Sequence, residues 1–328
     1  MRRDLRLDTL KGFLMVWVVY GHIPFNLFFI EKSNFFTALT SCIYFFHMPL
    51  FFALSVLFIK SDYKWLVKRV ALILLPYVFW FFYENRFLFL ENYQLFFEKI
   101  IIGNWNSIKS ILWFLPALLS LNTFFFVFNL SSRSFKIILL AISILTFCFS
   151  SEIALIHNKV PFGIDVAFYL FLLIFLIKYI YENERIIESI NFSLILLMIF
   201  GSIAILFYFE PIKTITQFHS RIDLAQFSVP ATLVGYISFL ILNISIFILF
   251  LKLNYNKQLA YIGFYSFPIF LMHVIILYKI PELLQFDNLI LNIIFLLITF
   301  VLSIGVPIIL SKLLMRVSDK FKFIGLIK

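Results

Sequence analysis

Long runs of apolar residues, separated by short polar interruptions, make up most of the chain. Runs of about 20 apolar residues have the length that a helix needs to cross ~30 Å of hydrocarbon. Placing a boundary at each polar interruption predicts an all-α protein with about ten membrane-spanning helices. The ten predicted segments are 9–30, 41–59, 70–90, 111–130, 136–151, 162–181, 190–209, 229–251, 258–280 and 288–311.

The composition excludes an ordinary soluble domain. Of the 328 residues, 63% are hydrophobic and 13% are charged, and the mean hydropathy is +1.02. In soluble domains about half of the residues are apolar and about a quarter are charged. No internal repeat or linker divides the pattern, so residues 1–328 are predicted to form a single integral-membrane domain. The two cysteines, Cys42 and Cys148, fall inside predicted spans and match no metal-ligand or redox spacing.

The distribution of Lys and Arg predicts the orientation of the helices. If the N-terminus is cytoplasmic, 19 of the 27 Lys and Arg residues lie on the cytoplasmic side, which is the bias that membrane proteins show. An even number of spans then places both termini in the cytoplasm. The net charge of +10 follows from basic loops and tails beside anionic lipid, and does not indicate binding of nucleic acid.

Three of the predicted spans carry a histidine at a similar depth. Counting about 1.5 Å per residue from the outer end of each span places His22 ~12 Å, His47 ~9 Å and His273 ~10 Å below the outer boundary. The other two histidines, His157 and His219, are predicted in outer loops. An ionisable group in hydrocarbon is costly, so its presence suggests function. An imidazole there can act as a general base, can ligate a metal or haem, or can hydrogen-bond across helices for packing alone.

The residues around these histidines resemble those of a known family. The stretch Arg6-Leu7-Asp8-Thr9-Leu10-Lys11-Gly12, followed by Tyr20-Gly21-His22, resembles the opening of membrane-bound acyltransferase family 3 proteins, many of which have Arg where Lys11 stands. Further matching stretches follow in the family's order: Phe46–Ser55, Lys68-Arg69 with Pro76-Tyr77, Leu112–Leu115, and Ile262–Ser266 with His273. Together they cover about the whole chain. They resemble most the sugar O-acetyltransferase branch, typified by fucose-4-O-acetylase-like proteins.

The resemblance implies transfer of an acyl group, usually acetyl from acetyl-CoA, to a hydroxyl of a cell-surface polysaccharide or its lipid-linked precursor. Acetyl-CoA is then a co-substrate, no metal is expected, and the location is the bacterial cytoplasmic (inner) membrane. CoA is a cytoplasmic polyanion, and basic residues near the inner ends of the first and third spans are suited to its phosphates. These residues are Arg6, Lys11 and Arg69, with Asp8 orienting Arg6 or Lys11. Each of the basic residues is equally explained by the positive-inside rule.

The acceptor side is predicted at the outer ends of the spans. His22 is the predicted general base on the acceptor hydroxyl, with an acetyl-histidine intermediate as a variant, and His47 is predicted to orient or assist it. Trp113, Arg86 and His273 are predicted to line the acceptor site. Candidates for further contacts with sugar hydroxyls are Asp165, Arg221 and Asp223.

Two other classes of function are compatible with the same polar layer. In a transporter or flippase for a glycan or acyl group, the layer would line a pathway, and helices broken by Gly and Pro would favour that interpretation. In a redox protein, the histidines would hold a haem or a quinone.

Overall fold

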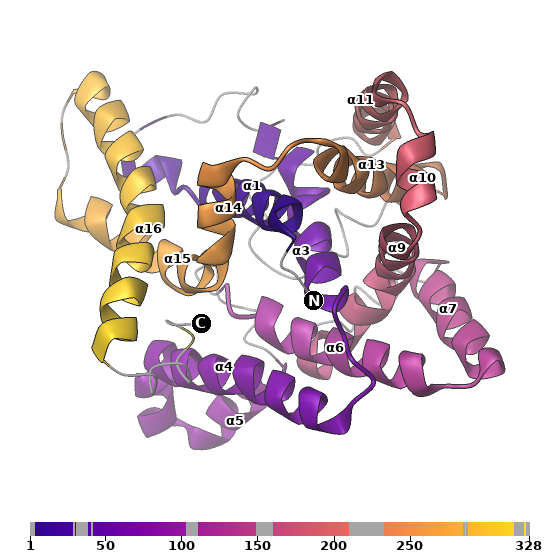
Figure 1. Cartoon of the computed structure of the whole chain (residues 1–328). Helices are drawn as coiled ribbons and strands as arrows, with labels where there is room; N and C mark the ends of the chain where they lie inside the picture. Colours follow the sequence, from indigo (N-terminus) through magenta and orange to yellow (C-terminus); the bar gives the residue numbers. More distant parts are fainter. Residues whose placement is uncertain are drawn as a thin grey trace. The chain divides into compact units, whose positions relative to one another are not determined.

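The computed structural model describes residues 4–28, 30, 39–40, 42–102, 111–148, 160–209, 233–284, 286, 288–317 and 325. Within these residues the secondary structure is helical, with no strand (Figure 1). The all-α prediction is therefore correct for the described chain. Each of the ten predicted segments overlaps at least one helix.

The chain divides into two compact units. Unit 1 consists of Met1–Met48 and Leu253–Lys328, and unit 2 of Pro49–Lys252. Unit 1 therefore combines the two ends of the chain, which contain His22, His47 and His273.

Unit 1 is built around the first helix. Helix α1 packs against α14 and α15, and α15 packs against α16; α14 lies beside α1 in Figure 1. The elements of this unit are α1 (Leu5–Gly21), η1 (Phe25–Phe28), α14 (Lys257–Phe264), α15 (Ser266–Leu283) and α16 (Leu289–Val317).

Unit 2 holds the central part of the chain. Helix α4 packs against α5 and α6, α9 packs against α6, α7 and α13, and α11 packs against α13. Aromatic stacking contributes to its core: the Phe125 and Phe171 rings are stacked with their centroids 4.3 Å apart. The elements are α3 (His47–Val56, which begins at the end of unit 1), α4 (Tyr63–Glu91), α5 (Tyr93–Ile102), α6 (Phe114–Leu130), α7 (Arg133–Cys148), η3 (Pro161–Gly163), α9 (Ile164–Glu182), α10 (Glu184–Ser189), α11 (Phe192–Phe209) and α13 (Leu233–Lys252).

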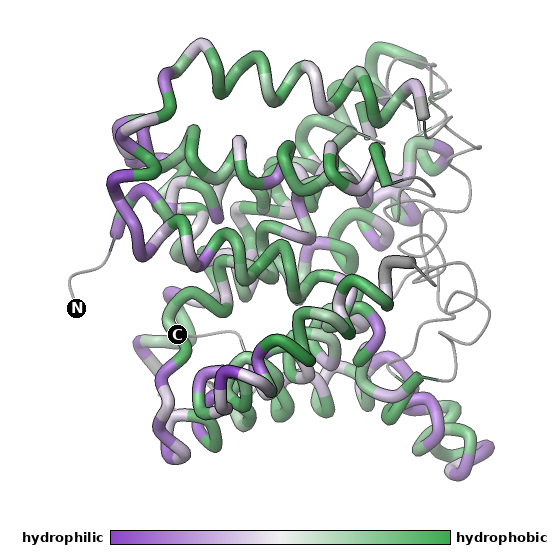
Figure 2. Tube along the Cα trace, turned by 90° about the vertical axis from the view of Figure 1, so that its right-hand side faces the viewer, coloured by the Kyte–Doolittle hydropathy of each residue, from purple (hydrophilic) through white to green (hydrophobic). Residues whose placement is uncertain are grey.

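Five helices of the described chain are long and apolar enough to cross a membrane. They are Tyr63–Glu91, Pro161–Glu182, Leu233–Lys252, Ser266–Leu283 and Leu289–Arg316, and shorter apolar helices cover Cys42–Val56, Phe114–Leu130 and Phe192–Tyr208. Figure 2 shows apolar residues along the length of the long helices. Many of these residues point outward: Leu297 and Val301 of α16 are 56% and 64% exposed. Such surfaces suit lipid as the surrounding solvent. The count of ten spans and the cytoplasmic termini stay predictions.

Two predicted spans are broken helices. The segment 9–30 divides at His22–Pro24, where α1 ends and the short η1 begins. Pro24 has no backbone N–H and disfavours helical geometry at Ile23, which is consistent with the end of α1 just before it. The segment 258–280 divides at Tyr265, between α14 and α15. The depths were counted along uninterrupted helices, whereas His22 lies at the C-cap of α1; the depths themselves stay predictions.

Helix α14 begins at a side-chain cap that can be tested. The Asn256 side-chain oxygen accepts hydrogen bonds from the backbone N–H groups of Gln258 (3.0 Å) and Leu259 (2.9 Å). Replacing it in Asn256→Ala leaves these donors without that acceptor, and we expect a loss of about 1 kcal/mol in the free energy of unfolding. Thermal unfolding in detergent measures this loss. Asn256→Asp, which retains an acceptor, serves as the control and should be close to the wild type.

Candidate active site

The three buried or half-buried histidines of unit 1 share one local geometry. In each, the ring Nδ1 contacts a backbone carbonyl of the preceding helical turn. The acceptors are Val18 for His22 (2.8 Å), Ile43 for His47 (2.7 Å), and Ile269 (3.0 Å) and Phe270 (2.8 Å) for His273. Because a carbonyl oxygen only accepts, Nδ1 carries the hydrogen in the neutral ring and Nε2 has the electron pair. Each ring is therefore held as a base whose reactive atom is Nε2.

His22 and His273 are in direct contact. Their ring centroids are 5.1 Å apart and their planes are nearly perpendicular, at 79°. The two residues come from opposite ends of the sequence and meet because α15 packs against α1. His22 is partly exposed, whereas His273 is fully buried.

His47 belongs to the same cluster through Tyr44. The Tyr44 ring lies against His47, with the centroids 4.8 Å apart. The Tyr44 hydroxyl donates a hydrogen bond to the carbonyl of Gly21 (3.3 Å), the residue before His22. His22 is near enough to interact electrostatically with both His47 and His273. The structure thus brings together the three histidines that the sequence placed at similar depth. Tyr44 was missed, although its place three residues before His47 is one helical turn away.

Two of these imidazoles have a buried, unsatisfied nitrogen. Nε2 of His47 and Nε2 of His273 find no hydrogen-bond partner among the described residues, and both side chains are fully buried. Burying such an acceptor costs roughly 1–3 kcal/mol. The cluster, which we call the histidine cluster (His22, His47 and His273), is therefore suited to a hydrogen-bond donor or a proton supplied from outside the protein.

Two glycines bring α1 and α14 into backbone contact. A Cβ on Gly12 would overlap the carbonyl oxygen of Leu259, and a Cβ on Gly263 would overlap the carbonyl oxygen of Asp8 and lie 2.8 Å from the backbone nitrogen of Gly12. Small residues allow such close helix crossings in membrane proteins. The Thr9 hydroxyl adds a link, because it accepts a hydrogen bond from the backbone N–H of Asn256 (3.1 Å) at the start of α14. The crossing fixes α1, whose far end carries His22.

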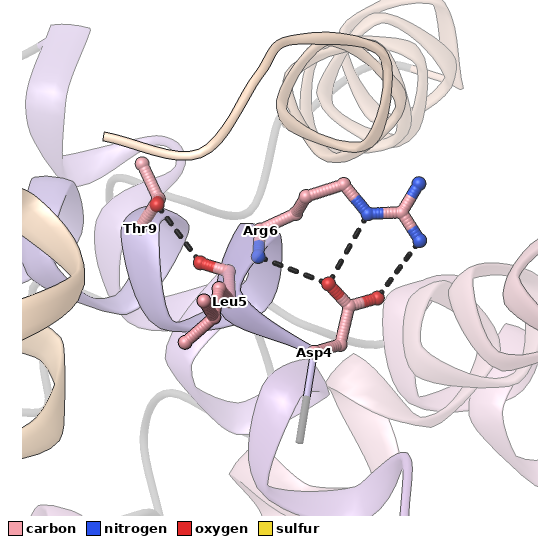
Figure 3. Close-up of polar contacts among 4 residues, drawn as sticks. All are labelled: Asp4, Leu5, Arg6 and Thr9. Atoms are coloured by element: carbon pink, nitrogen blue, oxygen red, sulfur yellow. Dashed lines mark hydrogen bonds and ion pairs between the residues drawn. The ribbon is translucent and has the colours of Figure 1, made fainter. Parts of the chain in front are cut away.

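The first turns of α1 hold three of the residues predicted to bind the acyl donor. The guanidinium of Arg6 donates to both carboxylate oxygens of Asp4, at 3.1 Å and 2.9 Å (Figure 3). Burial alone would raise the pKa of Asp4, but the hydrogen bonds and charge of Arg6 outweigh it and hold this pKa below its usual value. Asp8 is buried and Lys11 half-buried on the same helix. Asp4, which the sequence pattern did not single out, therefore orients Arg6.

The other predicted residues belong to unit 2. Arg69 of α4 donates from Nε to the side-chain oxygen of the buried Asn122 of α6 (3.4 Å). Arg86 is exposed, donates to the carbonyl of Tyr83 (2.7 Å) and lies 4.7 Å from the centroid of the Phe87 ring.

Trp113 is the residue just before α6, and its ring lies near that of Phe52, with a centroid distance of 6.2 Å. Asp165 lies in the first turn of α9. His157, His219, Arg221 and Asp223 lie outside the described residues. In the described part of the chain, no three His, Cys, Asp or Glu side chains gather in an arrangement that could hold a metal ion.

Sequence comparison identifies the family. A family model described as an acyltransferase domain, that of acyltransferase family 3, matches residues 4–312 and so runs through both compact units. Searches of the curated proteins and of the solved structures find no significant match. Because the family match covers nearly the whole chain and several helices are suited to cross a membrane, the protein belongs to acyltransferase family 3 and is a multi-pass membrane acyltransferase.

Proposed function

We propose that the protein transfers acetyl from acetyl-CoA to a hydroxyl of a cell-surface polysaccharide or of its lipid-linked precursor, in the bacterial inner membrane with both termini in the cytoplasm. The observation that supports the proposal is the geometry of His22: its hydrogen bond, its exposure and its neighbouring ring. Its Nδ1 is held on the Val18 carbonyl (2.8 Å), the residue is partly exposed, and its ring contacts the buried His273. A partly exposed imidazole with a fixed tautomer, whose Nε2 carries the electron pair, has the properties of a general base.

In the proposed reaction the acceptor hydroxyl gives its proton to Nε2 of His22. The oxygen then forms a bond to the carbonyl carbon of the acyl group, and the carbon–sulfur bond of acetyl-CoA breaks. The proton on His22 goes to the thiolate that leaves, which regenerates the neutral imidazole. His47, which shares the same tautomer, orients or assists His22, and Trp113 and Arg86 contribute to the acceptor site.

The donor side of the proposal uses Arg6, Asp8, Lys11 and Arg69. Arg6 has the planar fork that binds phosphate in two places, and Asp4 already holds this fork in a fixed orientation. Lys11 adds a second positive charge on the same helix, and Asp8 orients Arg6 or Lys11. Arg69 is held by Asn122.

Arg6→Gln tests the donor site. We expect the KM for acetyl-CoA to rise roughly tenfold with little change in kcat, because a charged hydrogen bond to a phosphate is lost. The control is Arg185→Gln, which removes an exposed arginine of α10 and should leave both constants unchanged. An unchanged KM in Arg6→Gln would remove this residue from the donor site.

The proposed function itself is tested with labelled substrate. Membranes from cells that lack the gene are mixed with the purified protein and [14C]acetyl-CoA, and the glycan fraction is then analysed by mass spectrometry. We expect label in the glycan and one acetyl mass increment on its repeating unit. Absence of label from the glycan, with wild-type protein that is folded, would rule the proposed reaction out.

One observation favours a second candidate, the transport of a glycan or acyl group. The helix break between α1 and η1 lies at His22, in the histidine cluster, and transporters bind their substrates at such breaks. In that case cells that lack the protein would accumulate a precursor that is already acetylated, which the same mass spectra would detect.

A further inference from the structure

His273 occupies a position that is ill suited to direct contact with the acceptor. It is fully buried, whereas the neighbouring His22 is partly exposed. The ring is also fixed more firmly than the other two, because its Nδ1 contacts two carbonyls, those of Ile269 (3.0 Å) and Phe270 (2.8 Å). A substrate that approaches from the exposed side meets His22 first. His273 can therefore affect the reaction most directly through its contact with His22, whose ring centroid lies 5.1 Å from its own.

The fixed tautomer gives the His273 ring a definite polarity. Since Nδ1–H is turned to its own helix, the edge that faces away from α15 carries Nε2 and its electron pair. This atom is buried and has no hydrogen-bond partner among the described residues. A preorganised dipole in a water-excluded site interacts strongly with a charge that develops beside it. The charge that develops beside His273 in the proposed reaction is that of His22, which becomes an imidazolium.

We propose that His273 is a positioning residue for His22: the electron pair on its Nε2 stabilises the imidazolium that His22 becomes when it takes the acceptor's proton. His273 itself neither gains nor loses a proton. The proton moves from the acceptor hydroxyl to His22 and then to the CoA thiolate, as in the proposed function, on which this inference rests. The role differs from the substrate contact that the sequence predicts for His273, and it explains why an imidazole is buried there with one nitrogen unsatisfied.

Two amide substitutions separate this role from a structural one. In His273→Gln the amide group reaches the position of Nε2, whereas in His273→Asn it reaches only the position of Nδ1. Gln therefore restores a hydrogen-bond acceptor toward His22, and Asn restores only the donor to the Ile269 and Phe270 carbonyls. We expect kcat to fall less than tenfold in His273→Gln and about a hundredfold in His273→Asn, with an unchanged KM for acetyl-CoA in both.

The kinetic experiment uses the full-length protein with acceptor membranes and [14C]acetyl-CoA. Higher kcat in His273→Gln than in His273→Asn supports the inference. Equal values, or a more active His273→Asn, overturn it and leave the transfer function intact. If the wild-type protein transfers no label, both the proposed function and this inference are overturned.

A measurement on the wild type covers the case in which the variants do not fold. Histidine labelled with 15N distinguishes a protonated from an unprotonated ring nitrogen by NMR. We expect resonances from rings that carry hydrogen on Nδ1 and none on Nε2. A spectrum in which every neutral histidine carries its hydrogen on Nε2 would overturn the inference, because His273 would then have no electron pair to offer.

Discussion

Gly263→Ala should prevent the protein from accumulating in its folded form. The added Cβ would overlap the carbonyl oxygen of Asp8 and lie 2.8 Å from the backbone nitrogen of Gly12. Both obstacles are backbone atoms of α1, so no side-chain rotation relieves them, and α14 has to move away from α1. Overpacking of this kind costs about 3 kcal/mol. A protein of ordinary stability thereby loses a large part of its free energy of unfolding. Gly12→Ala, on the opposite side of the crossing, should have the same effect.

The matched control for this prediction is Gly305→Ala. Gly305 also lies inside a helix of unit 1, α16, but a Cβ added there has no atom within 4 Å. Alanine favours a helix over glycine by roughly 1 kcal/mol, so this variant should fold at least as well as the wild type. Yield of monodisperse protein and the midpoint of thermal unfolding give the comparison. Similar yields of Gly263→Ala and Gly305→Ala would show that the crossing is not as tight as the backbone positions indicate.

The positions of the helices follow from the sequence because the physics behind them is simple. Apolar runs separated by charged residues have one favourable arrangement in lipid, and each of the ten predicted segments overlaps a helix. The prediction that the histidines have similar depth rests on the same physics, because residues near the same end of neighbouring spans lie in one layer. The contact between His22 and His273 agrees with that expectation.

The direction in which each side chain points could not be predicted in the same way. A helix that is apolar all round gives no amphipathic signal from which to derive its orientation, and α1 carries apolar residues on every face. The sequence therefore did not show that Tyr44 contacts His47, or that Asn122 holds Arg69. Asn122 had one usable signal, since it is an amide within an otherwise apolar run, and polar groups in such runs tend to find partners.

The helix breaks were the main error in the predicted fold. Pro24 marked the first break, but a proline can also kink a transmembrane helix without ending it, so its presence alone did not decide between the two. The break at Tyr265 is consistent with the packing on its two sides. Gly263 brings α14 against α1. Helix α15 then begins at Ser266 with Pro268 in its first turn, where the missing N–H of proline is least costly. The first break lies at His22 itself, a member of the histidine cluster, and the second follows the crossing of α14 with α1.

His22→Ala should abolish acyl transfer while the protein stays folded. Removing a general base lowers the rate by roughly 10²–10⁴-fold, and here the loss should appear in kcat, because three of the residues proposed to bind acetyl-CoA lie toward the other end of α1. The fold should tolerate the change, since His22 is partly exposed and its Nδ1 is bonded within its own helix, to the Val18 carbonyl (2.8 Å). The rate of [14C]acetyl transfer to acceptor membranes, at saturating acetyl-CoA, is the measurement.

A double substitution links this prediction to the histidine cluster. If His273 acts only through His22, adding His273→Asn to His22→Ala should cost almost nothing more, because the charge that His273 stabilises no longer forms. If the two effects instead multiply, His273 acts independently of His22, for example by contact with the acceptor. Normal acetylation by a folded His22→Ala protein would remove His22 from the chemistry altogether. Loss of export with an acetylated precursor would then point to the transport of the glycan.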